Sequence, residues 1–319
     1  LRKRHWDVQK QAGIDYISSN DFSFYDITLD TAVLLGIVPE RYRKLKLSTL
    51  DTYFAMARGY QGESGDVKAL AMKKWFNTNY HYIVPEVEDD MIMELSGDKL
   101  FAEYKEAKAL GIETKPIVVG PYTMLKLCRY TGSKKAADFT DAFVNVYKQI
   151  IEKCETQGAL WLQIEEPALV QDMSKEDIAL FHKIYDALLS VSDSCKILLQ
   201  TYFGDVRDIY KDLITMPFAG IGLDFLEGKK TAALVEEYGY PADKILFAGL
   251  VNGKNIWKNH YDRTLKVIRN LREKDINVVL STSCSLLHVP YTLQHENKLV
   301  KEYLEHFAFA EEKLTELKD

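Results

Sequence analysis

One arrangement of hydrophobic and polar residues recurs along this chain. A short apolar run gives way at its C-terminal end to side chains that can hydrogen-bond or ionise, most clearly where Trp161-Leu162-Gln163-Ile164 leads into Glu165 and Glu166. The same arrangement occurs at 197–202, 221–224 and 278–285. Short apolar runs are typical of parallel strands buried on both faces, and polar strand ends are where an α/β barrel presents a ligand site.

Helical patterns fill the intervals between the apolar runs. Further strands are predicted at 14–17, 116–119 and 245–250. Apolar residues at spacings of three and four predict a helix from Phe139 to Cys154, ended by Gly158, and Ser174 with Asp177 forms a capping box that opens another. Strand-to-helix-to-strand spacing of this kind demands parallel strands. Since no Gly-x-Gly-x-x-Gly motif opens the first unit, we expect a barrel rather than a nucleotide-binding sheet.

Composition narrows the class of protein. With 319 residues, 47% of them hydrophobic, and no linker-like or low-complexity tract, residues 1–319 are expected to form a single domain. The net charge of −6 comes from interspersed acids and bases, so neither nucleic acid nor an anionic membrane is an expected partner. No run is long enough to span a bilayer, and the four cysteines are widely separated, which predicts a cytoplasmic protein with reduced thiols.

Three groups of residues are candidates for chemistry. Glu165 and Glu166 could form a general acid/base pair as in barrel glycosidases, or could hold a loop through its backbone N–H groups. Cys284 and His288 could ligate zinc, but no second Cys/His pair accompanies them, so a packed thiol and a loop histidine are the favoured interpretation.

The third group is an aromatic segment, 73–82, that also carries Lys74, Asn77, Asn79 and His81. Bases and amides beside aromatic rings suit a flat ligand that bears carboxylates. A long loop held together by its aromatic side chains explains the pattern equally well.

Several long strings carry a resemblance to a known family. They are residues 20–26, 53–59, 75–86, 119–121, 163–170, 201–203 and 281–290. Across nearly its whole length the chain resembles the N-terminal half of cobalamin-independent methionine synthase, a zinc enzyme that moves a methyl group from 5-methyltetrahydropteroyl-polyglutamate to homocysteine. The resemblance implies two face-to-face (βα)8 barrels in the whole enzyme, with zinc, homocysteine and the catalytic histidine all in the C-terminal barrel.

The resemblance also implies what this chain lacks. Where the catalytic barrel has a His-x-Cys zinc pair, the matching triplet here is Thr201-Tyr202-Phe203. Cys284 corresponds to a third zinc ligand of the catalytic barrel, but no other ligand accompanies it. Two ligands short, the site is not expected to hold zinc. The resemblance therefore predicts no catalytic residue and no metal site in this chain, with zinc in the absent C-terminal half.

Lys74 and Asn79 match positions of the family that contact the polyglutamate tail of the folate. Glutamyl carboxylates can accept charge-assisted hydrogen bonds from an ammonium and an amide. A further basic run of the family lies upstream of Leu1, Glu165 stands in place of the usual Asp, and Asn77 stands where Asp or Asn occurs. Neither the Glu165 nor the Asn77 departure affects the assignment of the two candidate residues.

The expected function is thus that of the N-terminal barrel of a methyltransferase, which supports the catalytic barrel, helps to hold the folate tail and is inactive alone. Two alternatives are a stand-alone folate or small-molecule binding protein and a barrel hydrolase that uses Glu165. The resemblance implies that 14–17 is the family's second strand, so that seven barrel strands are present and 80–84 lies outside the barrel. Two open strand edges would follow, so the chain is expected to be less stable than the complete half, and either to self-associate or to need its missing segment to close the barrel.

Overall fold

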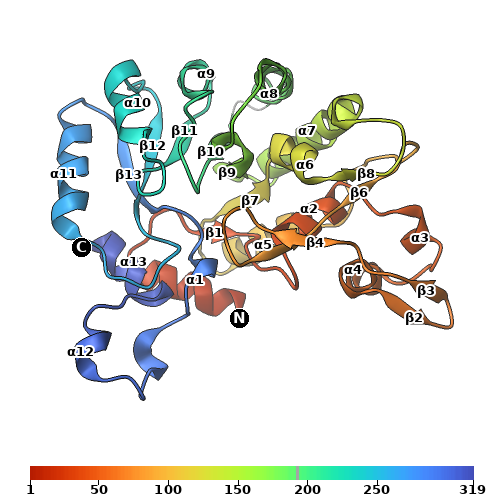
Figure 1. Ribbon diagram of the computed structural model, residues 1–319, viewed down its shortest axis with the longest axis horizontal. Coiled ribbons are helices and arrows are strands. Elements are labelled where there is room, and N and C mark those ends of the chain that lie inside the picture. The colour runs from red at the N-terminus through yellow and green to blue at the C-terminus, as the bar shows by residue number, and fades with distance from the viewer. Residues whose placement is uncertain (192–193) are drawn as a thin grey trace.

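A computed structural model describes residues 1–191 and 194–319 (Figure 1). Its main sheet has seven parallel strands in the order β1-β7-β9-β10-β11-β12-β13. They are β1 (Ser18–Ser19), β7 (Lys115–Val119), β9 (Trp161–Glu165), β10 (Lys196–Gln200), β11 (Gly220–Asp224), β12 (Ile245–Val251) and β13 (Val278–Thr282). Helices lie in an arc outside these strands in Figure 1. The prediction of a (βα)8-type barrel that lacks one strand is confirmed.

Helices alternate with the barrel strands because each carries an apolar face that packs on the sheet. They are α1 (Arg2–Gln11), α5 (Lys99–Ala109), α6 (Pro121–Leu127), α7 (Thr140–Thr156), α8 (Lys175–Leu188), α9 (Tyr210–Thr215), α10 (Thr231–Tyr238), α11 (Tyr261–Arg272) and α13 (Ala310–Lys318). As predicted, α7 ends just before Gly158, whose φ is +75°, and α8 opens with a capping box of Ser174 and Asp177. In the described residues, no helix is both long and apolar enough to cross a membrane.

The first strand lies later than the sequence predicted. Residues 14–17 are not a strand, and β1 is formed by Ser18 and Ser19, which pair with Lys115 and Pro116. Ile17 is buried instead in a small cluster with Trp6, from α1, and with residues of the α5 region. The apolar residues at 14–17 thus pack against the protein without forming a strand: Ile17 packs on the helices, and the Tyr16 ring packs against Trp161 of β9 and Phe247 of β12.

A long excursion separates β1 from β7 and has a core of its own, to which Leu29, Tyr42, Met56 and Ile83 belong. It contains α2 (Ile27–Leu34), α3 (Glu40–Arg43), α4 (Thr49–Arg58), β2 (Tyr60–Gly62), β3 (Gly65–Val67), β4 (Met72–Lys74), β5 (His81–Ile83) and β6 (Glu86–Val87). Outside the excursion, β8 (Arg129–Tyr130) pairs with β6, and α12 (Lys301–Leu304) precedes α13. Strand β5 pairs with β4 as an antiparallel hairpin, which confirms that 80–84 lies outside the barrel sheet.

The hairpin of β4 and β5 reaches the mouth of the barrel, where the C-terminal ends of the strands meet. Its Phe76 ring lies 6.0 Å from that of Phe203, in the loop after β10, and its Tyr80 ring lies 6.0 Å from that of His288, after β13. The Asn77 amide donates to Glu227, in the loop after β11. Because these loops follow three different strands, the hairpin turn lies over the face on which α/β barrels bind ligands.

The two ends of the sheet, β1 and β13, are not paired with each other among the described strands. The β13 edge is poorly covered, since Leu280 is 39% exposed and Leu265 of the neighbouring α11 is 42% exposed. The open edges that the sequence predicted are present, and self-association stays a prediction.

Candidate functional site

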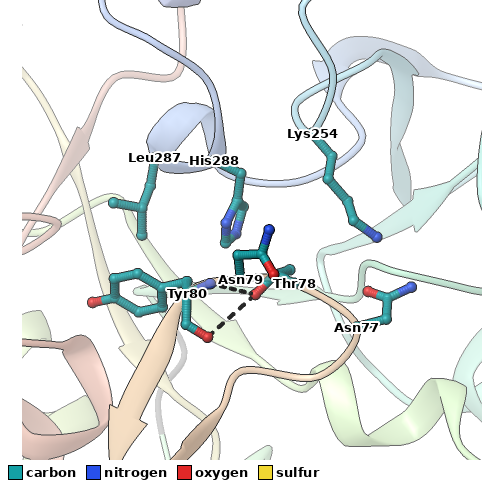
Figure 2. Close-up of a pocket in the computed structure, with 7 residues that line it drawn as sticks. All are labelled: Asn77, Thr78, Asn79, Tyr80, Lys254, Leu287 and His288. Atoms are coloured by element: carbon teal, nitrogen blue, oxygen red, sulfur yellow. Dashed lines mark hydrogen bonds between the residues drawn. The ribbon is translucent and has the colours of Figure 1, made fainter.

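A hollow of about 340 Å³ lies at the barrel mouth beneath the hairpin turn (Figure 2). It is lined by the turn, by the loop after β12 and by a short 3₁₀ helix after β13, Leu286–His288. The lining residues are Asn77, Thr78, Asn79, Tyr80, Lys254, Leu287 and His288. In Figure 2 the Lys254 ammonium extends toward Asn77, and the His288 ring points toward the turn. A cation, amides and a histidine therefore share one space with the apolar parts of Tyr80 and Leu287.

An ion pair fixes Lys254 at this mouth. Its ammonium lies 2.9 Å from one carboxylate oxygen of Glu227 and donates to the other at 3.0 Å. The Asn77 amide donates to the same carboxylate at 3.0 Å. Both charged side chains are only partly exposed, 23% for Lys254 and 29% for Glu227, so solvent screens this pair less than an open surface pair.

The buried carboxylate of Asp224, at the end of β11, organises the surrounding loops. It accepts hydrogen bonds from the backbone N–H groups of Phe203 at 3.1 Å, Leu226 at 2.8 Å and Glu227 at 2.9 Å. Burial raises the pKa of Asp224 to about 6, although these N–H groups favour the ionised form. Through them Asp224 holds Phe203 at a φ of +74° and places its ring 5.2 Å from the Lys254 ammonium.

His288 is neutral at physiological pH. Burial is the main cause and the charge of Lys254 the second, and together they lower the pKa of His288 from 6.5 to about 4. Its ring packs edge-on against Phe203 at 5.5 Å. A neutral imidazole has one N–H donor and one acceptor nitrogen, so His288 can offer a hydrogen bond without adding charge to the hollow.

This lowered pKa predicts a pH dependence of stability. Between pH 6.5 and about 4 the unfolded chain binds a proton at His288 that the folded chain does not. The free energy of unfolding therefore falls as the pH is lowered through this window, by about 1 to 2 kcal/mol once screening at this half-buried site is allowed for. His288→Asn lacks this dependence. Urea unfolding at about pH 7 and about pH 4.5 should show a smaller acid loss in the variant; equal losses would contradict the assignment.

The two residues predicted to contact the folate tail lie on this one hairpin. Asn79 is exposed and lines the hollow. Lys74 is also exposed, at the end of β4, where it pairs with His81, but it is not among the residues that line the hollow. The His81 ring contacts the Asn79 carbonyl through Nδ1 at 2.9 Å. Lys74 and Asn79 therefore belong to the same hairpin, but only Asn79 lines the hollow.

The structure disfavours a hydrolase that uses Glu165. The Glu165 carboxylate accepts hydrogen bonds from Gln163 Nε2 at 2.8 Å and from the Tyr202 hydroxyl at 2.9 Å, and Lys115 in turn bonds to Gln163. Burial raises the pKa of Glu165. Since both of its oxygens are bonded to neighbouring side chains, Glu165 belongs to a polar network of the protein.

Glu166, next to it, is fully buried and serves a different part of the fold. It accepts from the backbone N–H groups of Tyr122 at 3.0 Å and Thr123 at 2.7 Å, at the start of α6, and from the Tyr185 hydroxyl at 2.6 Å. The two carboxylates bond to different parts of the protein, so they do not form an acid/base pair. Glu166 accepts hydrogen bonds from backbone N–H groups at the N-terminus of α6 that have no partner within the helix.

The triplet Thr201-Tyr202-Phe203 does not offer a set of zinc ligands. The Thr201 hydroxyl donates to the Gly222 carbonyl at 2.8 Å, and the Phe203 ring is packed against His288. Cys284 is buried, and burial raises the pKa of its thiol to about 12, which keeps it protonated. Across residues 1–191 and 194–319 no group of three or more His, Cys, Asp or Glu side chains is placed to hold a metal ion. The side chains present at these positions do not fit a zinc ion.

Sequence comparison gives the family. The family model described as "Cobalamin-independent synthase, N-terminal domain" matches residues 1–275. The chain belongs to this family. As a member of the cobalamin-independent synthase family it is 56% identical over 319 residues to a 5-methyltetrahydropteroyltriglutamate–homocysteine methyltransferase of Campylobacter jejuni subsp. doylei, and 54% identical to one of Lactococcus lactis subsp. cremoris strain SK11.

Both relatives are longer than this synthase domain. The match covers 100% of the chain but 42% of each relative. Among solved structures, a B12-independent methionine synthase from Shewanella sp. W3-18-1, in complex with selenomethionine, matches with a TM-score of 0.67 at 13% identity and covers 99% of this chain and 84% of that chain. At that identity the likeness shows a shared fold alone.

Proposed function

We propose that this chain is the N-terminal barrel of a 5-methyltetrahydropteroyltriglutamate–homocysteine methyltransferase, and that the whole protein transfers a methyl group from 5-methyltetrahydropteroyl-polyglutamate to homocysteine to form methionine. The printed activity of relatives that are 54 to 56% identical across the chain supports this. In the proposal, residues 1–319 act as one domain that supports a C-terminal catalytic barrel. A cytoplasmic location suits the four buried cysteines, none of which forms a disulfide in the part of the chain that the structure describes.

The role proposed for this barrel is to hold the polyglutamate tail of the folate. The observation that carries it is the position of the β4–β5 hairpin, whose turn lies over the ligand-binding face of the barrel. Lys74 offers an ammonium and Asn79 an amide from this hairpin, and both are exposed to solvent. Each can donate hydrogen bonds to the free carboxylates of a γ-linked glutamyl chain.

Zinc and homocysteine are assigned by this proposal to the C-terminal barrel, and this chain alone is inactive in methyl transfer. The support is chemical: the triplet at the end of β10 is Thr201-Tyr202-Phe203, and the Cys284 thiol is held protonated by burial. Zinc binding requires deprotonated ligands, usually three or four of them. We expect far less than one zinc per chain in metal analysis of chelator-washed protein; a stoichiometric zinc would refute this part.

The tail site is tested by shortening Lys74. Lys74→Ala should weaken binding of a pteroyltriglutamate by about 1 to 3 kcal/mol, which is the range for hydrogen bonds to charged groups, and should leave a pteroylmonoglutamate nearly unaffected. Isothermal titration of the 319-residue chain with both ligands measures the difference. Lys73→Ala is the matched control, because Lys73 is equally exposed on β4 but points to the opposite face of the strand.

Salt provides an independent readout of the same contact. Raising the ionic strength should reduce the advantage of the triglutamate, because ion pairs at this exposed site are screened. Equal losses for the two ligands in Lys74→Ala, or equal losses in Lys73→Ala and Lys74→Ala, would place Lys74 outside the tail site.

A further inference from the structure

Lys254 offers a cation to the hollow from the barrel side, across from the hairpin that carries Lys74 and Asn79. In Figure 2 its side chain descends from the loop after β12, and its ammonium points into the space above Asn77. Sequence reasoning did not single out this lysine. Its neighbours in the chain, Gly253 and Asn255, give no local signal of a ligand site.

The protein holds Lys254 in place. Its backbone N–H donates to Asn252 Oδ1 at 2.8 Å, and its ammonium lies 5.2 Å from the centre of the Phe203 ring. A side chain that is already ordered loses less conformational freedom when a ligand binds. An ammonium has three N–H donors, so Lys254 can share them between Glu227 and a ligand carboxylate, and the two anions then compete for the same positive charge.

The rest of the hollow suits a carboxylate on a short aliphatic chain. His288 is neutral and can donate one N–H, and the Asn79 amide lies on the opposite wall. Leu287 and the ring of Tyr80 supply apolar surface beside these polar groups. A volume of about 340 Å³ is at the lower end of the roughly 300 to 1,000 Å³ usual for small-molecule sites, so the hollow fits part of a ligand.

We propose that Lys254 is a further specificity-determining residue, which binds a glutamyl carboxylate of the folate tail in this hollow, and that Glu227 competes with that carboxylate for the ammonium. This inference rests on the proposed function, since it names a second contact for the same tail. The competition follows from the geometry, because the Lys254 ammonium lies 2.9 Å and 3.0 Å from the two carboxylate oxygens of Glu227.

Two substitutions should then have opposite effects. Lys254→Met removes the cation and should weaken pteroyltriglutamate binding about ten-fold, while pteroylmonoglutamate changes less than about two-fold. Glu227→Gln removes the competing charge but keeps an acceptor for Asn77, so it should strengthen triglutamate binding about three-fold. Lys254→Arg keeps the charge and should retain most of the preference for the triglutamate.

The experiment is isothermal titration of the 319-residue chain and each variant with the two ligands, and circular dichroism confirms that each variant is folded. Lys105→Met, on the exposed face of α5, is the control and should change neither affinity. Two results would overturn the inference: an unchanged triglutamate preference in Lys254→Met, or weaker triglutamate binding in Glu227→Gln.

These results can be separated from a failure of the proposed function. If the unsubstituted chain shows no preference for the triglutamate, or if Lys74→Ala leaves that preference intact, the tail site itself is wrong. If the preference exists and depends on Lys74 but not on Lys254, only the role of Lys254 is refuted.

Discussion

Replacing Glu166 with alanine is expected to lower the free energy of unfolding by about 3 kcal/mol or more. The substitution leaves three buried donors without their acceptor: the N–H groups of Tyr122 and Thr123 and the hydroxyl of Tyr185. Each unsatisfied buried donor costs about 1 to 3 kcal/mol. Urea unfolding of the two proteins measures the loss as a shift in the midpoint at an unchanged slope.

Two further substitutions show whether the loss belongs to the hydrogen bonds. Glu166→Gln keeps the shape of the side chain and one acceptor oxygen, so its free energy of unfolding should lie between that of the parent chain and that of the alanine variant. Glu165→Gln should lower the free energy of unfolding least of the three substitutions, since the Glu165 carboxylate bonds only to the side chains of Gln163 and Tyr202. A loss below about 1 kcal/mol in Glu166→Ala would contradict a structural role for this carboxylate.

The 319-residue chain is expected to self-associate. The substitution Leu280→Lys is expected to raise the dissociation constant of that association about ten-fold, which is about 1.4 kcal/mol. Leu280 lies on β13, an edge strand without a strand partner on its outer side among the described residues, and is 39% exposed. Open strand edges beside apolar surface favour pairing with another chain, and a lysine on the edge opposes it. Sedimentation velocity over a range of concentrations measures the equilibrium.

The control for this prediction is Leu110→Lys. Leu110 has nearly the same exposure, 40%, but lies at the end of α5, away from the open edge of β13. It should leave the association unchanged. A chain that stays monomeric at every concentration, or an equal effect of the two lysines, would show that the edge does not drive association.

Most of the fold could be predicted from the sequence because its strands carry strong local patterns. Strands β9, β11 and β13 are apolar runs with polar ends. The end of α7 is marked in the sequence by Gly158, and the start of α8 by the Ser174 cap. The position of β1 could not be predicted in this way. Ile17 is apolar because it packs against Trp6, and the two serines that form the strand have no hydrophobic signal of their own.

The candidate site could be predicted only in part, for a physical reason. Lys74 and Asn79 lie in one unusual segment, so the sequence pointed to them together. Glu227, Lys254 and His288 follow three different strands and meet only when the sheet curls. The interpretation of Cys284 and His288 as a packed thiol and a loop histidine is confirmed, but the sequence did not indicate that the imidazole faces the hollow. The rule that strand ends share one face indicates the region but not the partners.

The most direct test of the central claim, that this barrel holds the polyglutamate tail, is the ratio of two dissociation constants of the unsubstituted chain. One is measured for pteroylmonoglutamate and the other for pteroyltriglutamate, at low salt, by isothermal titration. If the barrel binds the tail, the triglutamate should bind at least about ten-fold more tightly, which is about 1.4 kcal/mol. Equal dissociation constants for the two ligands would contradict the account.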